Sequence, residues 1–372
     1  MVDITKCFDS INHKLLLDKL KCYGIDGVEH SWFESYLSDR KQAVYCNGKL
    51  SDFLSIRFGV PQGSVLGPLL FLLFVNDVVN TPLIRDSMLN LFADDLIVCA
   101  SGKTYEEVKI KLEYNVNSLS TWYFDNRLKI HPKKTKFMIV GSKAQTDHIN
   151  RCNADIPFII HGTNRVYASN CAKYLGLLFE PNLNWSSHIS AIAKKLNFQY
   201  VILKSLSSYC SKSLLRKYYN CYVQPRIDYG ISVWGCTTDN NISIIQRIQN
   251  RIGRVLSGNF DYNVSGLSIL HDLKIFNIAQ RRDYFLSSLT YQAANHLAPV
   301  YLSDHIICNS DMHDFFTRRG HDLYLPKINC DMYKNSLAIR GGNLFNSLPN
   351  EIKLCSSIKA FKKLYSDYIF SP

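Results

Sequence analysis

The spacing of the apolar residues changes about halfway along the 372-residue chain. Before Trp185 the apolar residues fall in short runs, such as residues 89–93 and 96–100, which suit strands better than helices. After Trp185 the apolar residues recur with the spacing of amphipathic helices, most clearly over residues 189–206. A strand-rich half followed by a helical half predicts an α+β unit joined to an α-helical one.

Local patterns predict the other elements of the chain. Asn47-Gly48 separates two strand-like runs, residues 42–46 and 53–58, and therefore predicts a hairpin, because this dipeptide readily adopts the positive φ of a tight turn. The best candidate for a linker is residues 235–241. The remaining predicted helices cover residues 10–22, 26–37, 68–79, 105–126, 214–222 and 242–256, and the remaining predicted strands cover residues 137–140, 158–160 and 174–179.

The net charge of the chain indicates which classes of partner it could bind. Lys and Arg number 43 against 31 Asp and Glu, so the net charge is +12 and the isoelectric point is about 9.0. Such an excess favours a polyanionic partner, nucleic acid first and an anionic membrane second, although a basic protein without such a partner has the same composition. Arg247, Arg251 and Arg254 share one helix face and suit a nucleic-acid backbone, although a solvated charged face has the same pattern.

The cysteines and the apolar runs bear on where the protein acts. The 12 cysteines include no CxxC pair, which favours reduced thiols over a disulfide framework or a zinc ribbon. The sequence shows no signal peptide or membrane span. Together these features predict an intracellular protein.

An acidic doublet, Asp94-Asp95, lies between the two apolar runs 89–93 and 96–100. Two rigid strands would hold both carboxylates at the tip of a tight turn. Phosphoryl transfer with two metals requires acids fixed near two divalent ions that lie about 3.5–4 Å apart. Asp3, at the end of a short strand, is a further candidate. A plain polar turn remains the alternative for the doublet, because Asp is common in turns.

Five segments in order resemble the motifs of reverse transcriptases from LINE-type (non-LTR) retrotransposons. Residues 2–13 resemble motif A, residues 59–68 motif B and residues 92–95 motif C. Residues 126–136 resemble motif D, and residues 174–188 resemble motif E and the entry to the thumb. The similarity continues through Trp234-Gly235 to Leu348-Pro349, in a pattern typical of Jockey-like elements, and so covers nearly the whole chain.

This resemblance implies a fold and an activity. It implies an α+β polymerase palm, an antiparallel sheet with packed helices, over residues 1–182, then thumb helices over residues 183–236 and a helical C-terminal region over residues 237–372. The implied enzyme is an RNA-directed DNA polymerase, a nucleotidyltransferase that adds dNTPs to a primer 3′-hydroxyl. The implied cofactors are two Mg²⁺ ions, for which Mn²⁺ can substitute.

The resemblance also implies roles for individual residues. Asp3, Asp94 and Asp95 would be the metal-binding catalytic acids, joined by the backbone carbonyl of Ile4. Lys134 would be the proton donor to pyrophosphate, with a solvated basic face as the alternative. Phe8 would be a steric gate against a 2′-hydroxyl, with a core aromatic as the alternative. The implied nucleotide and template contacts are Gln62 and Gly63, and the implied primer grip is Tyr174, Leu175 and Gly176.

The resemblance implies nucleic-acid partners: an RNA template, a DNA primer and target DNA, together with dNTP, and no membrane. It places the protein in the nucleus and cytoplasm. The chain begins at motif A, and the fingers of the family would precede that motif, so a second hypothesis is an inactive, truncated retroelement remnant that at most binds nucleic acid. A cellular relative, such as a telomerase or a maturase, fits the second half of the chain less well.

Overall fold

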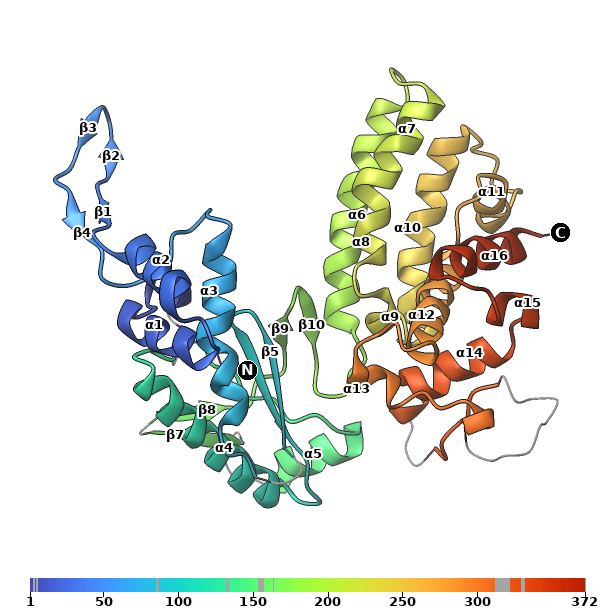
Figure 1. Ribbon diagram of the computed structural model, residues 1–372. Helices are drawn as coiled ribbons and strands as arrows, with labels where there is room; N and C mark the ends of the chain where they lie inside the picture. The colour runs from blue at the N-terminus through green and yellow to red at the C-terminus, as the bar shows by residue number, and fades with distance from the viewer. Residues whose placement is uncertain are drawn as a thin grey trace. The chain divides into compact units, whose positions relative to one another are not determined.

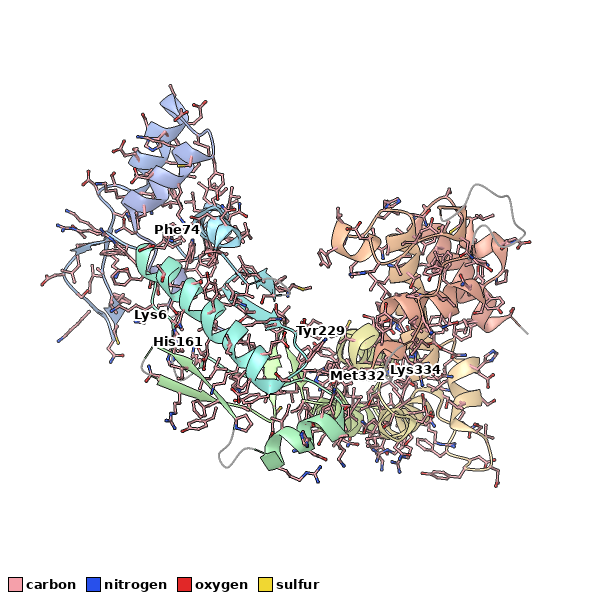
Figure 2. All side chains as sticks on the ribbon, turned by 90° about the horizontal axis from the view of Figure 1, so that it is seen from below. Lys6, Phe74, His161, Tyr229, Met332 and Lys334 are labelled. Atoms are coloured by element: carbon pink, nitrogen blue, oxygen red, sulfur yellow. The ribbon has the colours of Figure 1, made fainter. Side chains whose placement is uncertain are left out.

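The computed structural model describes residues 1–2, 4, 6–84, 87–131, 134–152, 157–162, 164–311, 322–328 and 332–371. Its contacts divide the chain into two compact units, unit 1 (Met1–Gly176) and unit 2 (Leu177–Pro372) (Figure 1). Of the side chains labelled in Figure 2, Lys6, Phe74 and His161 belong to unit 1, and Tyr229, Met332 and Lys334 belong to unit 2. Each unit has its own buried apolar clusters.

Unit 1 is built on helices that surround one main apolar core. The near-continuous apolar sequence of α3 places Leu70, Phe71 and Phe74 in that core, where they are at most 1% exposed. Side chains fix the starts of two other helices: Asn12 accepts a hydrogen bond from the N–H of Leu15. Thr104 caps α4 in the same way. The helical elements of unit 1 are η1 (Cys7–Asp9), α1 (His13–Cys22), α2 (Gly27–Leu37), α3 (Leu66–Val75), η2 (Asn76–Asn80), α4 (Tyr105–Asp125) and α5 (Lys143–Cys152).

Small antiparallel sheets complete unit 1. The predicted hairpin forms around Asn47 and Gly48, which adopt φ of 49° and 78°. Its tip pairs β2 with β3 and its base pairs β1 with β4. The strands are β1 (Lys41–Gln42), β2 (Tyr45–Cys46), β3 (Lys49–Leu50), β4 (Leu54–Ser55), β5 (Ser87–Phe92), β6 (Asp95–Ala100), β7 (Phe158–His161), β8 (Asn164–Tyr167) and β9 (Ala172–Tyr174), with β5–β6 and β7–β8 also antiparallel.

Two predicted strands are wrong in detail. Residues 137–140 form only an isolated bridge, in which Phe137 pairs with Ala168. Residues 174–179 do not form one strand, because Leu175 and Gly176 turn the chain with φ of 44° and 81°. The turn separates β9 from β10 (Leu177–Phe179), so an apolar run that looks continuous in sequence becomes two short strands.

Unit 2 is helical. One core holds Trp185, Trp234 and Ile245, and a second core holds Tyr291 and Phe361. Gly258 ends the helix α10 (Asp239–Ser257) in the left-handed conformation, as its position predicts. The helical elements are α6 (Ser186–Leu206), α7 (Lys212–Tyr218), the π-helix η3 (Tyr219–Val223), α8 (Gln224–Asp228), α9 (Ile231–Trp234), α10 (Asp239–Ser257), α11 (Gly266–Asp272), α12 (Ile278–Ala294), α13 (Val300–Ser303), η4 (Asn309–Asp311), η5 (Tyr333–Asn335), the π-helix η6 (Leu337–Gly341), α14 (Gly342–Asn346), α15 (Asn350–Lys353) and α16 (Ile358–Phe370).

The stretch predicted as a linker, residues 235–241, is instead a short turn followed by the first residues of α10 (Asp239–Ser257). Thr237 Oγ1 and Asn241 Nδ2 both donate to the carbonyl of Asn184, over 2.6 and 3.0 Å. Cys236 is only 8% exposed. The polar residues that resemble a linker in sequence therefore bind the backbone of Asn184, 53 and 57 residues earlier in the chain. Among the helices that the structure describes, none is both long enough and apolar enough to cross a bilayer.

Candidate active site

The acidic doublet lies at the end of the β5–β6 hairpin. Phe92 pairs with Asp95 across the hairpin, which leaves Ala93 and Asp94 as the two turn residues. Ala93 adopts φ of 50°, a left-handed conformation that is uncommon for a residue with a Cβ atom. Asp94 and Asp95 are half-buried, and Leu96, the next residue, is 1% exposed. The prediction of two strands around the doublet is therefore confirmed.

The start of the chain lies beside this hairpin. The N–H of Val2 donates to the carbonyl of Leu96 over 2.8 Å. Ile4 forms an antiparallel bridge with Ile130, and Met1 exchanges backbone hydrogen bonds of 3.0 and 3.1 Å with Lys136. Val2 and Ile4 are 4% and 6% exposed. The residues on both sides of position 3 are thus fixed by β6, Ile130 and Lys136, whereas Asp3 itself lies outside the described residues.

The 3-10 turn η1 connects the chain start to three other parts of unit 1. Cys7 Sγ donates to Asp94 Oδ2 over 3.4 Å. The ring of Phe8 packs against the ring of Phe71 with centroids 4.5 Å apart. Asp9 Oδ1 accepts a 2.8 Å hydrogen bond from Gln62 Nε2. Three consecutive residues therefore bind the acidic turn, helix α3 and the loop before α3.

Burial and charge act together on the Cys7 thiol. Burial raises the pKa of Cys7 to about 12, and the negative charge of Asp94 adds to the rise. A carboxylate can only accept a hydrogen bond, so the hydrogen shared between the two groups belongs to the thiol. The neutral thiol thus acts as a hydrogen-bond donor to one oxygen of Asp94.

The loop of residues 59–63 is held against the segment that carries η1. The Gly59 N–H donates to the Ile11 carbonyl over 2.7 Å, and the Gly59 carbonyl lies 2.7 Å from His13 Nε2. Gly59 needs φ of 88°, and a Cβ atom there would lie 2.9 Å from Asp9 Cα. Glycine is therefore required at this position both by conformation and by space.

A serine hydroxyl fixes the end of the same loop where it enters α3. Ser64 Oγ donates to the Pro61 carbonyl over 2.7 Å and accepts from the Gly67 N–H over 2.9 Å. Gln62 and Gly63, the predicted nucleotide and template contacts, are exposed between these anchors. The loop therefore presents Gln62 on a fixed backbone, with its amide nitrogen directed at Asp9.

The predicted primer grip begins at the last residue of β9, Tyr174. Burial raises the pKa of the Tyr174 phenol, and the negative charge of Asp95 raises it further. Leu175 and Gly176 form the turn after β9. Lys134, the predicted proton donor, is exposed, and its N–H donates to the His131 carbonyl over 3.1 Å.

Sequence reasoning missed Cys7 and Asp9 as neighbours of the site. Both residues lie inside the segment that resembles motif A, but their partners are 87 and 53 residues away in sequence. No local pattern reports such distant contacts. Within the described ranges no group of three or more His, Cys, Asp or Glu side chains forms a metal cluster. The carboxylates of Asp94 and Asp95 nevertheless supply the hard oxygen donors that suit Mg²⁺.

The arginine stripe of α10, Arg247, Arg251 and Arg254, differs from a simple basic surface. Arg247 and Arg251 are exposed, and Arg251 donates to Asn197 of α6. Arg254 is only 8% exposed and donates to the carbonyls of Asp261 and Val264 over 2.6 and 2.7 Å. Arg254 therefore holds the loop after α10, and the expectation that it faces a nucleic-acid backbone is wrong.

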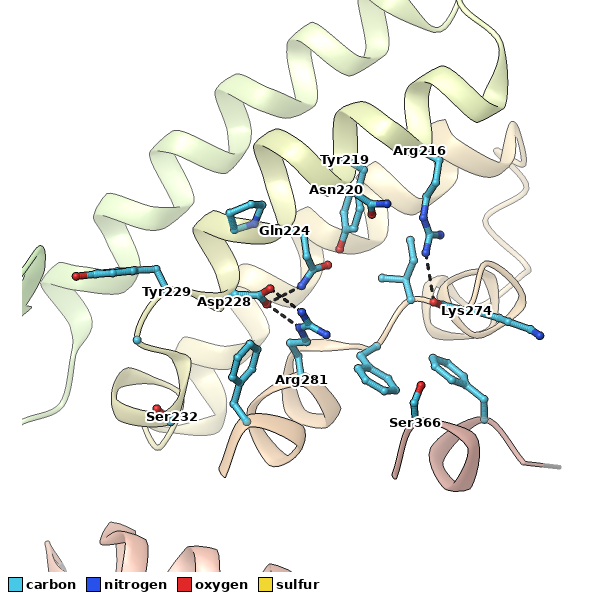
Figure 3. A pocket seen from close by; sticks show the side chains of 16 residues that line it. Arg216, Tyr219, Asn220, Gln224, Asp228, Tyr229, Ser232, Lys274, Arg281 and Ser366 are labelled. Carbon is cyan, nitrogen blue, oxygen red and sulfur yellow. Dashed lines mark hydrogen bonds and ion pairs between the residues drawn. The ribbon is translucent and has the colours of Figure 1, made fainter. Parts of the chain in front are cut away.

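Unit 2 contains a pocket of about 810 Å³, lined by both charged and aromatic side chains and shown in Figure 3. The guanidinium of Arg281 donates two hydrogen bonds of 2.7 and 2.6 Å to the Asp228 carboxylate, and Gln224 Nε2 donates to the same carboxylate. At the other end, Arg216 donates to the backbone carbonyls of Leu273 and Lys274. The charged side chains seen in Figure 3 thus join α7 and α8 to the segment around the start of α12.

Comparison with known proteins agrees with these observations. Residues 1–179 match the family "Reverse transcriptase (RNA-dependent DNA polymerase)". The chain is 29% identical over 282 residues to a probable RNA-directed DNA polymerase from transposon X-element of Drosophila melanogaster, covering 74% of this chain and 30% of that protein. It is 29% identical over 297 residues to the corresponding protein from transposon BS of the same species, covering 75% and 31%.

A third relative is the retrovirus-related Pol polyprotein from type-1 retrotransposable element R2 of Popillia japonica, 24% identical over 294 residues, covering 73% of this chain and 44% of that protein. The chain spans about 30% of the length of the X-element and BS proteins. Three observations agree in indicating a reverse transcriptase: the five motif-like segments, the acidic hairpin tip beside the chain start, and the relatives from several mobile elements. Residues 1–179 therefore form a reverse transcriptase domain, and the chain is similar to RNA-directed DNA polymerases of LINE-type, non-LTR retrotransposons.

Proposed function

We propose that this chain is the polymerase part of a longer retroelement protein and copies RNA into DNA by adding dNTPs to a primer 3′-hydroxyl. The observation that carries the proposal is the acidic turn of the β5–β6 hairpin, paired with the chain start through Val2 and Leu96, inside a segment that matches the reverse transcriptase family. The named activities of the X-element and BS relatives support it.

The proposal assigns the regions of the chain to parts of a polymerase. Residues 1–182 would be the palm, residues 183–236 the thumb helices, and residues 237–372 a helical C-terminal region. The mixed helices and small antiparallel sheets of unit 1 and the helices of unit 2 support a division of this kind. The partners would be an RNA template, a DNA primer, target DNA and dNTP, and the protein would act in the nucleus and cytoplasm.

The proposed metal ligands are Asp3, the carbonyl of Ile4, Asp94 and Asp95. Asp94 and Asp95 offer carboxylate oxygens at a rigid turn, and Val2 and Ile4 are fixed on either side of position 3, so the described residues fit such a site. Two Mg²⁺ ions, or Mn²⁺ in their place, would lower the pKa of the attacking hydroxyl and neutralise charge on the leaving pyrophosphate when bound.

The other proposed roles belong to the chain's own side chains. The ring of Phe8, held by Phe71, would exclude a 2′-hydroxyl because an apolar face offers that group neither space nor a partner. Gln62 and Gly63 would contact the incoming nucleotide and template. Lys134 would donate a proton to pyrophosphate. The turn of Tyr174, Leu175 and Gly176 would hold the primer end.

A primer-extension assay tests the proposal. The chain is incubated with an RNA template, an annealed DNA primer, dNTPs and Mg²⁺, beside the variants Asp94→Asn and Asp52→Asn. Asp52 is an exposed acid of unit 1 and is the matched control. We expect extension by the wild type and by Asp52→Asn, and loss of extension in Asp94→Asn. Template binding without extension by the wild type would refute the proposal and support the inactive remnant.

A further inference from the structure

We propose that Cys7 is a positioning residue for Asp94: its thiol holds one carboxylate oxygen and leaves the other directed to a divalent cation. This inference rests on the proposed function, because it deepens the role of the same acidic turn. It starts from the 3.4 Å contact between Cys7 Sγ and Asp94 Oδ2. That contact joins the segment resembling motif A directly to the one resembling motif C.

The direction of the Cys7 side chain is fixed by its surroundings. Cys7 is 6% exposed and packs in the same core cluster as Val2, Ile4 and Leu96. Its backbone carbonyl accepts a 3.2 Å hydrogen bond from the N–H of Ser10, which closes the η1 turn. The thiol cannot swing away from Asp94 without disturbing a core that also contains the residues flanking position 3.

The neighbours of Cys7 in sequence hold the same turn from two further sides. Phe8 is packed on Phe71, and Asp9 is bonded to Gln62. With both neighbours fixed, η1 cannot rotate as a unit, so the thiol donor stays at a constant position relative to the β5–β6 hairpin. Groups that orient a metal ligand from behind commonly affect metal affinity almost as strongly as the ligands themselves.

Asp94 has a particular need for such a donor. Asp95 follows it directly, and two adjacent carboxylates repel each other. Asp94 also occupies the tip of a two-residue turn, outside the strand pairing of the hairpin. A donor that binds Oδ2 restricts the rotation of the carboxylate and keeps Oδ1 available to a cation. A thiol is a weak hydrogen-bond donor, so we expect the Cys7 hydrogen bond to contribute modestly to orienting the Asp94 carboxylate, through Oδ2 alone.

Three variants separate a donor role from a packing role. Cys7→Ala removes the donor, Cys7→Ser keeps a donor with a slightly shorter reach, and Cys22→Ala is the control because Cys22 is an exposed cysteine of the same unit. Both substitutions at position 7 remove the sulfur atom and its packing, so the difference between Ser and Ala reports the hydrogen bond. Thermal melting of all three variants checks that the full chain remains folded.

The deciding measurement is Mn²⁺ binding to the full chain, followed by electron paramagnetic resonance of the free ion. We expect Cys7→Ala to weaken Asp94-dependent binding by about 10-fold, at the lower end of what loss of an orienting group does. We expect Cys7→Ser to recover most of that loss, and Cys22→Ala to match the wild type. Equal affinity in Cys7→Ala and wild type, or equal weakening in Cys7→Ala and Cys7→Ser, would overturn the inference.

Primer extension run in parallel keeps the two proposals apart. Cys7→Ala should show a raised Mg²⁺ concentration for half-maximal extension, with the maximal rate changed less than the metal dependence, whereas Cys22→Ala should match the wild type. If the wild type binds Mn²⁺ through Asp94 but extends no primer, the proposed polymerase function fails while the role of Cys7 stands. If Asp94→Asn binds Mn²⁺ as tightly as the wild type, the role of Cys7 fails, whatever the extension assay shows.

Discussion

Replacing Gly59 by alanine tests how closely the loop before α3 approaches the η1 turn. The new Cβ atom would lie 2.9 Å from Asp9 Cα, 3.1 Å from the Asp9 carbonyl oxygen and 3.1 Å from the Phe8 carbonyl oxygen. All three neighbours are backbone atoms, so no side chain can rotate to make room. The two segments must separate, or the Gly59 backbone must leave φ of 88° and break its hydrogen bond to Ile11.

The expected loss of stability in Gly59→Ala is the sum of two contributions. The left-handed conformation costs an alanine about 1–2 kcal/mol relative to the right-handed one. Forcing a methyl group into a closed contact costs about 1–3 kcal/mol more. We therefore expect Gly59→Ala to destabilise unit 1 by about 3 kcal/mol. Gly24→Ala is the matched control, because Gly24 has φ of 80° and a Cβ atom added there would meet no heavy atom within 4 Å, so it should cost only about 1–2 kcal/mol.

Hydrogen exchange of the full chain, read by mass spectrometry on peptides of α1 and α3, measures the local free energy of opening for both variants. We expect a drop about 2 kcal/mol larger in Gly59→Ala than in Gly24→Ala, because only the first substitution meets a closed contact. Equal drops in the two variants would show that the segments do not approach as closely as the distances state. The reasoning about the anchored loop would then be refuted.

Two further predictions concern unit 2. Arg281→Met should lower the free energy of unfolding of unit 2 by about 2 kcal/mol in urea denaturation, because it leaves the half-buried carboxylate of Asp228 without its bidentate partner. The double variant with Asp228→Asn should lose less free energy of unfolding than the sum of the losses in the two single variants. Burial lowers the pKa of His188 below 6.5, so the stability that its neutral form contributes is complete above pH 6.5 and is lost as the pH falls through the folded-state pKa. His188→Gln should therefore reduce the dependence of stability on pH, measured by hydrogen exchange of α6 peptides. An unchanged pH dependence would show that His188 is not the group responsible.

The local parts of the site were predictable from the sequence because their signals are local. The β5–β6 hairpin follows from two apolar runs around two acids, and the hairpin at Asn47-Gly48 follows from a dipeptide that favours positive φ. The helix α3 follows from an apolar run. In each case the residues that specify the element are also the residues that form it.

The errors arise where a turn or a side-chain contact interrupts a pattern that looks regular in the sequence. Residues 174–179 are mostly apolar and suit a strand, yet Leu175 and Gly176 turn between β9 and β10. Residues 235–241 have the polar composition of a linker, yet the carbonyl of Asn184 binds two of their side chains. The helix-face pattern of α10 assigned Arg254 to the surface, yet two loop carbonyls bury it. None of these partners is visible in the local pattern.

The contacts of η1 explain why a single short turn matters to the whole candidate site. Cys7, Phe8 and Asp9 point in three directions, as successive residues of a 3-10 turn must, and each meets a different element: the acidic turn, α3 and the Gln62 loop. A shift of η1 would therefore move the acid, the aromatic ring and the amide together. Precise placement of catalytic groups requires such shared supports, since a misplacement of about 1 Å can cost about 100-fold in rate. Substitutions in η1 should accordingly change metal binding and nucleotide selection at once, whereas substitutions at the partner residues should change one of them alone.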